Sequence, residues 1–195
     1  AVVNLSRLFT TARTTLPPRY LDDSAHAAAY LSYFLPANLS KVQVLLDELP
    51  NDSGRETPDH TIAVLDLGCG PGTGALALLD WLWHRSPERA KTVSVLAADA
   101  SHAPLRDTKR LWEAYCQGVG ISSEGLRCVE GNLEHPLKGD LGQQIVRGGP
   151  YDLIIMANCL NELFSTAADP PAGRAAVVGQ LLPFLAPRGT IMIVE

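Results

Sequence analysis

The sequence predicts an α/β protein with a doubly wound, mostly parallel sheet, and three observations carry this prediction. Residues 62–67 are mostly apolar and β-prone, which suits a strand buried in a parallel sheet. Four glycines follow at alternate positions, from Gly68 to Gly74, and residues 75–83 are then a run of strong helix formers. A strand, a glycine loop and a helix in this order form the first half of a doubly wound fold.

The glycine series predicts a ligand site at the carboxyl end of this first strand. Glycines allow positive φ and let a ligand approach bare peptide, and the start of the next helix offers free N–H groups to a polar or anionic group. A turn without a ligand would not require four alternating glycines, because each increases the entropy lost on folding.

Two common nucleotide motifs fit the series poorly. A Walker phosphate loop ends in Gly-Lys-Ser/Thr, but no lysine occurs between the glycines and Lys91. The dinucleotide pattern Gly-x-Gly-x-x-Gly fails from Gly68, because Thr73 holds the last place. Counted from Gly70, the pattern fits loosely, with Ala75 last.

The series Asp66-x-Gly68-x-Gly70-x-Gly72 instead resembles the first motif of class I S-adenosylmethionine-dependent methyltransferases. The resemblance implies a Rossmann-like fold and S-adenosylmethionine as the cofactor. It also implies that this loop, Cys69 included, wraps the methionine and ribose part of the cofactor, with Asp66 near the cofactor's amino end.

Asp99 is predicted to bind the cofactor's ribose. Residues 92–99 form the second expected strand, and a carboxylate at its end can accept hydrogen bonds from both ribose hydroxyls. Ala100 beside it is assigned to the same site. The alternative is that Asp99 caps the helix expected at 104–118, but Ser101 and Pro104 already supply start signals for that helix.

Asn132 follows a short third strand at residues 126–130. The methyltransferase resemblance implies that this turn presents a side chain to the adenine amino group. An aspartate is more usual there, and an amide can make the same bond.

The end of the fourth strand, residues 151–157, is expected to lie beside the first strand and to face the transferred group. Asn158, Asn161 and Glu162 are therefore candidates for the acceptor site, and Asn158 also for the cofactor site. Asn161 and Glu162 can equally well cap the helix that follows. We assign no catalytic base.

Two classes of nucleic-acid methylation fit this segment poorly. Methylation of an exocyclic base amine usually uses Asn/Asp-Pro-Pro-aromatic, whereas Asn158 is followed by Cys-Leu-Asn. Cytosine C5 chemistry needs a thiolate, typically after a proline, and Cys159 lacks that proline. We interpret Cys159 as a buried thiol.

The first 59 residues are predicted to form a helical cap, and residues 60–195 the cofactor-binding α/β domain. Residues 1–20 hold three arginines and no acid, a weak transit-peptide character, but an amphipathic lead-in is the favoured interpretation. A helix at 25–35 should follow an N-cap cluster at residues 22–24 and stop at Pro36, and Ser40 should cap a second helix at 41–49. The polar segment 50–59 would separate the two parts.

The last expected elements are a helix at 170–185, kinked or broken near Pro183, and a fifth strand at 189–195. A class I methyltransferase sheet has seven strands, so we expect the domain to be truncated at its C-terminus, without strands six and seven. An exposed fifth strand would favour self-association.

Composition fits one globular domain of ordinary size: 46% of the residues are hydrophobic and 19% are charged. The net charge of −5 and a pI near 5.5 argue against a broad nucleic-acid-binding face. No apolar run approaches the length of a membrane span. The four cysteines show no metal-binding spacing, so we expect reduced thiols and no metal site.

A narrower resemblance rests on Ala29-Tyr30-Leu31, the Leu45-Leu46-x-x-Leu49 segment, the glycine motif, the fourth strand closing on Asn-Glu-Leu, and Val194-Glu195. Together these are similar to the small-ribosomal-subunit assembly methyltransferase-like family of bacteria and mitochondria. The resemblance implies ribosomal RNA or the small subunit as partner, and we expect a cytoplasmic protein. The downstream cysteine cluster of that family is not in this chain, so no iron–sulfur site is expected. A small-molecule methyltransferase and a non-catalytic assembly factor remain alternatives.

Overall fold

The protein is built on a five-stranded parallel sheet with the order β3-β2-β1-β4-β5. The computed structural model describes residues 1–12, 15–17, 19–49 and 60–195. Its strands are β1 (Ile62–Leu67), β2 (Val93–Asp99), β3 (Leu126–Glu130), β4 (Tyr151–Ala157) and β5 (Leu185–Val194). β1 pairs with β2 on one side and with β4 on the other, so the strand order reverses between β1 and β4. Ligands of open α/β sheets bind at the carboxyl ends of the strands at such a reversal.

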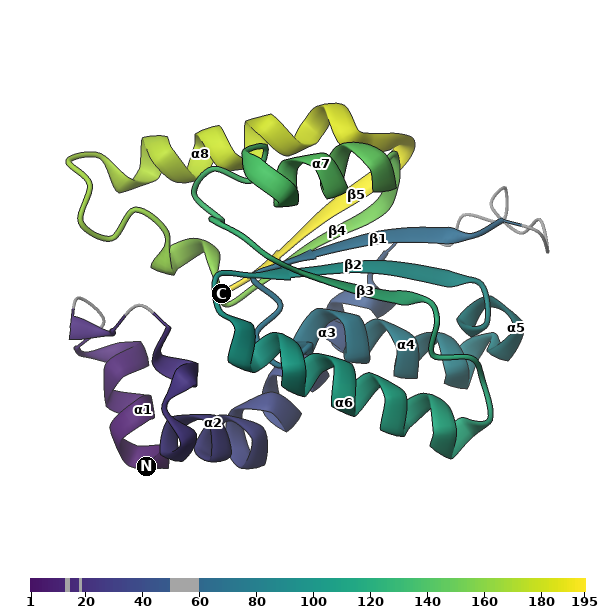
Figure 1. The fold of residues 1–195 in the computed structure, drawn as a ribbon, viewed down its shortest axis with the longest axis horizontal. Helices are drawn as coiled ribbons and strands as arrows, with labels where there is room; N and C mark the ends of the chain where they lie inside the picture. Colours follow the sequence, from purple (N-terminus) through teal and green to yellow (C-terminus); the bar gives the residue numbers. More distant parts are fainter. Residues whose placement is uncertain (13–14, 18, 50–59) are drawn as a thin grey trace.

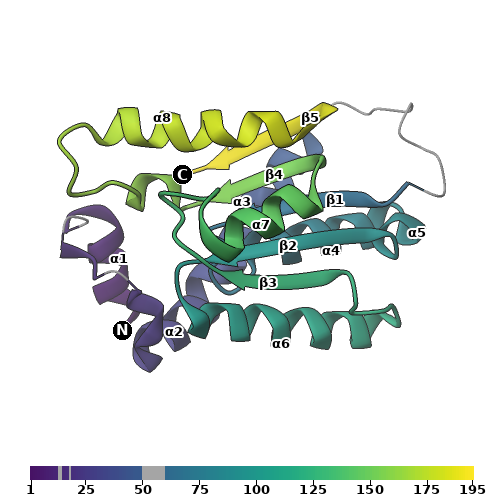
Figure 2. The ribbon, with the colours of Figure 1, turned by 45° about the horizontal axis from the view of Figure 1, so that its top comes forward.

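Helices cover both faces of the sheet (Figures 1 and 2). One face is covered by α3 (Leu35–Asp47), α4 (Thr73–Arg85) and α6 (His102–Val119), with the short α5 (Pro87–Ala90) after α4, and the other by α7 (Gly139–Gly148) and α8 (Pro170–Leu181). Neighbouring strand residues point into different layers: Val64 packs in the first and Leu65 in the second. Burial on both sides explains why the strands are almost continuously apolar.

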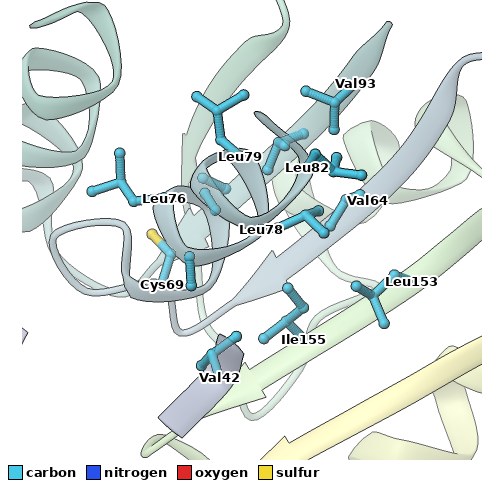
Figure 3. Close-up of a cluster of buried hydrophobic side chains, with 14 of the residues drawn as sticks. Val42, Val64, Cys69, Leu76, Leu78, Leu79, Leu82, Val93, Leu153 and Ile155 are labelled. Carbon is cyan, nitrogen blue, oxygen red and sulfur yellow. The ribbon is translucent and has the colours of Figure 1, made fainter. Parts of the chain in front are cut away.

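The glycine loop is held against the sheet by α4, whose apolar residues are shown in Figure 3. Leu78, Leu79 and Leu82 are almost fully buried and belong to the same core as Val64 and Val93. This packing fixes the start of α4, and with it the loop that connects β1 to α4.

The N-terminal residues form a cap at the end of the sheet toward which the strand arrows point (Figures 1 and 2). It contains α1 (Val2–Thr10), the 3-10 turn η2 (Tyr20–Asp22) and α2 (Ser24–Ala29). The cap has its own hydrophobic cluster, which includes Leu5, Leu21 and Tyr30. The amphipathic lead-in expected at residues 1–20 is therefore a packed helix over residues 2–10.

The prediction that Pro36 stops a helix and that Ser40 caps the next one was wrong. The Asp23 side chain does accept a hydrogen bond from the N–H of His26 at the start of α2, as an N-cap should. The helix then passes through a π turn, η3 (Tyr30–Phe34), directly into α3. Pro36 follows the π turn as the second residue of α3, so the irregular turn accommodates it, and the Ser40 hydroxyl donates to the Pro36 carbonyl.

Other expectations were met in part. The five strands lie where predicted, although β5 begins four residues earlier than expected, at Leu185. α8 ends at Leu181 and gives way to a 3-10 turn, η6 (Leu182–Phe184), which confirms the expected break near Pro183. The helix α7 was not predicted. The proposed boundary at residues 50–59 lies outside the described residues, so the division into 1–59 and 60–195 stays a prediction.

Candidate functional site

A cavity of about 740 Å³ opens at the carboxyl ends of β1, β2, β3 and β4, beneath the N-terminal cap. Most of the residues assigned to the site from the sequence line this cavity. They are Gly68, Gly70, Asp99, Ala100, Asn132, Asn158, Asn161 and Glu162.

The glycine loop supplies one wall of the cavity through Gly68 and Gly70. Both have positive φ, 74° and 53°. A Cβ on Gly68 would lie 2.4 Å from the Cβ of Cys159, so this glycine is required by packing against the end of β4. A Cβ on Gly70 would meet only Leu21, at 3.9 Å, so the Cα of Gly70 faces open space in the cavity.

Asp66, Cys69 and Gly72 do not line the cavity. The Asp66 carboxylate is fully buried and accepts a hydrogen bond from the N–H of Ala75 at 2.8 Å, at the start of α4. Burial raises the pKa of Asp66 to about 7. Asp66 thus supports the glycine loop from behind, and a side chain on Gly74 would collide with it. The assignment of Asp66 to the amino end of the cofactor stays a prediction.

Asp99 joins the cavity wall to the glycine loop. Its carboxylate accepts the N–H of Gly70 at 2.9 Å and the N–H of Ser101 at 3.0 Å. Burial raises the pKa of Asp99, and the bond from Gly70 opposes that shift. α6 begins at His102 after its N-cap Ser101 and has no side-chain cap bond, so Asp99 fixes the turn before the helix without capping it.

The carboxyl end of β3 and part of the cap form another wall of the cavity. Asn132 lines the cavity, and its side-chain oxygen accepts the N–H of Glu134 at 2.9 Å. The guanidinium of Arg19, in the cap, bonds Glu130 at 3.1 Å. The Ser101 hydroxyl donates to the carboxylate of Asp22, which ties η2 to the start of α6.

The segment after β4 turns sharply at the cavity. Asn158 has a left-handed backbone, with φ 54°, and its side-chain nitrogen is buried without a hydrogen-bond partner among the described residues. Non-glycine residues in this conformation cluster at functional sites. The Cys159 thiol donates to the carbonyl of Leu67 at 3.1 Å. Burial, and then the carboxylates of Glu195 and Glu162, raise the pKa of Cys159, so it is a structural thiol and is unsuited to act as a nucleophile.

Asn161 and Glu162 lie in a 3-10 turn, η5 (Leu160–Glu162), that borders the cavity. Arg174 of α8 fixes this turn. Its guanidinium donates to the Asn161 carbonyl at 2.7 Å and to the Leu163 carbonyl at 3.1 Å. The N-cap of the following helix is Asp169, so Asn161 and Glu162 do not cap it.

Sequence reasoning named no residue of the cap as part of the cavity. Tyr20, Leu21 and Tyr30 line it, together with Arg19. Phe9 packs edge-on against Tyr20, with ring centroids 5.4 Å apart, and holds this ring in place. The aromatic residues of the first 34 positions were a signal for such a wall, but their position relative to the sheet is set only by tertiary packing.

The described residues contain no group of three or more His, Cys, Asp or Glu side chains placed to hold a metal ion. None of the helices in the described ranges combines the length and the apolar composition needed to cross a membrane.

Solved methyltransferase structures share the fold of this chain. The chain is similar to an arsenic(III) S-adenosylmethionine methyltransferase from Chlamydomonas reinhardtii, with 20% identity and a TM-score of 0.50 over 78% of this chain and 47% of that one. It is also similar to the glycopeptide N-methyltransferase MtfA complexed with S-adenosyl-L-methionine, with 17% identity and a TM-score of 0.51 over 80% and 48% of the two chains. The chain therefore spans about half the length of these structures.

No protein-family model and no curated protein sequence matches the chain. At identities this low, structural similarity establishes the fold. The fold is the Rossmann-like fold of class I S-adenosylmethionine-dependent methyltransferases, as the sequence predicted.

Proposed function

We propose that the chain binds S-adenosylmethionine in the cavity at the strand ends and is an S-adenosylmethionine-dependent methyltransferase. The observation that carries the proposal is the bond between the Asp99 carboxylate and the N–H of Gly70. This bond brings Asp99, the acid proposed for the ribose, and Gly70, which has no side chain, to one cavity wall, at the point where the strand order reverses.

The residues of the cavity suit the parts of this cofactor. Asp99 keeps free lone pairs for the two ribose hydroxyls, because each carboxylate oxygen can accept more than one hydrogen bond. Gly68 and Gly70, which have no side chains, suit the methionine part, and Ala100 would border the ribose. The amide of Asn132 suits the adenine amino group. The buried, unpartnered amide nitrogen of Asn158 is a donor for a cofactor or acceptor oxygen.

When bound, S-adenosylmethionine supplies a methyl group that is already activated on a sulfonium. The protein then contributes mainly proximity and alignment of the acceptor. Asn158, Asn161 and Glu162 border the side of the cavity where an acceptor would enter, and Arg174 keeps the η5 turn in position.

A finer proposal is that the methyl acceptor is ribosomal RNA or another component of the small ribosomal subunit. This acceptor goes with a cytoplasmic location for the protein. Its support is the residue resemblance in the sequence. The alternative of a small-molecule acceptor is supported by the solved relatives, which are named for arsenic(III) and a glycopeptide. A cofactor-binding assembly factor without catalysis is the third candidate.

Calorimetry and methyl transfer test these proposals in order. The protein is expected to bind S-adenosylmethionine in preference to NAD, and a preference for NAD would refute the cofactor assignment. Labelled S-adenosylmethionine is then offered with ribosomal RNA, with small-subunit particles and with a metabolite extract. Cofactor binding without transfer to any of them would support the non-catalytic candidate.

A further inference from the structure

The segment after β4, residues 158–164, begins and ends with a left-handed residue that is not glycine. Asn158 has φ 54° and Phe164 has φ 57°. A bulky residue such as phenylalanine rarely adopts this conformation, and it persists only where the surrounding contacts impose it. Between the two, Asn161 lines the cavity, as Asn158 does, on the side assigned to the acceptor. The contacts of Phe164 therefore help to set the position of this acceptor segment (residues 158–164).

Two separate elements hold Phe164. On α8, Gly173 leaves room for its ring, because a Cβ there would lie 2.6 Å from the ring. Arg174, also on α8, donates to the carbonyl of Leu163, the residue just before Phe164. On the turn after β3, the Oε1 of Glu134 accepts the N–H of Phe164 at 2.6 Å. A backbone N–H bonded to a carboxylate makes a stronger bond than one bonded to a neutral carbonyl.

Glu134 also belongs to the wall of the cavity that was assigned to the adenine. Glu134 and Asn132 both line the cavity. The side-chain oxygen of Asn132 accepts the N–H of Glu134 at 2.9 Å, and its backbone carbonyl accepts the N–H of His135 at 3.1 Å. The residue proposed for the adenine and the carboxylate that holds Phe164 thus lie in one hydrogen-bonded turn. A ligand in contact with Asn132 would restrict this turn and, with it, the side chain of Glu134.

We propose that Glu134 is a positioning residue: S-adenosylmethionine bound against Asn132 orders the acceptor segment through the bond between Glu134 and Phe164. This rests on the methyltransferase function proposed above. Coupling between two ligands is reciprocal, so the acceptor binds more tightly to the protein–cofactor complex than to the free protein. The alternative is that the cofactor orders the segment by touching Asn158 or Asn161 directly, since both line the cavity. That route does not need Glu134.

Amide hydrogen exchange with and without saturating S-adenosylmethionine tests the coupling and needs no acceptor. In the wild type, the cofactor should slow exchange in residues 160–166 by about fivefold or more, and should also slow it in the glycine loop, residues 68–76. In Glu134→Ala, the slowing in residues 160–166 should be lost and that in residues 68–76 kept. The Kd for S-adenosylmethionine should rise by no more than the lost factor, because the coupling is reciprocal. Glu134→Gln should recover most of the slowing, because its amide oxygen still accepts the N–H of Phe164.

The matched control is Glu124→Ala, because Glu124 is an exposed acid just before β3, at the opposite end of that strand. This variant should keep the wild-type pattern in both segments. Slowing in residues 160–166 that survives in folded Glu134→Ala would show direct contact with the cofactor and overturn the coupling, while the methyltransferase proposal stands. Absence of slowing in these residues in the wild type, with the cofactor bound, would overturn the coupling without any variant. If calorimetry shows no S-adenosylmethionine binding to the wild type, the function proposed above fails and the coupling fails with it.

Discussion

Replacement of Asp99 by alanine tests the centre of the proposed cofactor site. The substitution removes a carboxylate that accepts two backbone N–H bonds, from Gly70 at 2.9 Å and from Ser101 at 3.0 Å. Hydrogen bonds to a charged group contribute about 1.5–3 kcal/mol each. The raised pKa of Asp99 shows that burying the charge opposes part of this gain. We therefore expect a net loss of about 2–3 kcal/mol in the free energy of unfolding.

The same substitution should weaken S-adenosylmethionine binding. Two ribose hydroxyls would lose a charged acceptor, and the peptide at Gly70 would lose its anchor. We expect the Kd to rise by roughly tenfold to several hundredfold, at about 1.4 kcal/mol for each factor of ten. The stability loss should lower Tm by roughly 4–12 °C, since 1 kcal/mol shifts a domain of this size by about 2–4 °C.

Calorimetric titration at a temperature where the variant is folded gives the Kd, and thermal unfolding without ligand gives Tm. Glu113→Ala is the control, because this acid is exposed on α6 and its ion pair with Lys109 is long, at 3.9 Å. A lower Tm with an unchanged Kd would show that Asp99 only fixes the loop and the start of α6, and the ribose assignment would be wrong.

Four further outcomes are expected. Gly70→Ala should fold, at a cost of about 1–2 kcal/mol for a left-handed alanine, and lose at least tenfold in S-adenosylmethionine affinity; unchanged calorimetric affinity would refute the peptide contact. Because the pKa of Asp66 is about 7 in the folded protein and near 4 when unfolded, the native state binds its proton more tightly, and stability should fall by about 3 kcal/mol as pH rises from 4 to 7. Urea unfolding of Asp66→Asn should lack this contribution, and a difference from wild type that is the same at every pH would contradict it. Arg174→Ala should lower methyl transfer about tenfold by releasing η5 while cofactor Kd holds, and a parallel loss of cofactor binding would exclude this local role. Light scattering should show self-association through the exposed edge of β5, reduced in Ile193→Lys, and a concentration-independent monomer would count against it.

The strands could be predicted because their residues are apolar and β-prone and both faces of the sheet are covered. The glycine series and Asp99 could be assigned because spacing along a strand–loop–helix unit fixes their position. α7 escaped prediction because Gly139, Gly142 and Gly148 lower its helix propensity. Gly142 is required by a contact that sequence alone does not show: a Cβ there would lie 2.1 Å from the Leu137 carbonyl oxygen.

The positions of Asp66 and Asp99 also depend on tertiary contacts. Both acids lie at strand ends, so the sequence predicts that both contact the ligand. In the structure, the Asp66 carboxylate bonds the start of α4 and the Asp99 carboxylate bonds Gly70. The contribution of Tyr20 depends on how the cap docks, because the cavity residues that belong to the sheet domain begin at Gly68, after the whole of α2 and α3.

The cap's separate hydrophobic cluster has a consequence for the protein's motions. Proteins often open in cooperative units, each with its own amide-exchange rate, and the cluster around Leu5 and Leu21 is the core of one such unit. A molecule in the cavity would touch both Leu21 and the sheet, so only the closed arrangement would bind it fully. Occupancy would then slow exchange in the cap helices α1 and α2 by the factor 1 + [ligand]/Kd and make the two cores open as one. Ligand concentration would thereby set how often the cap lifts from the strand ends.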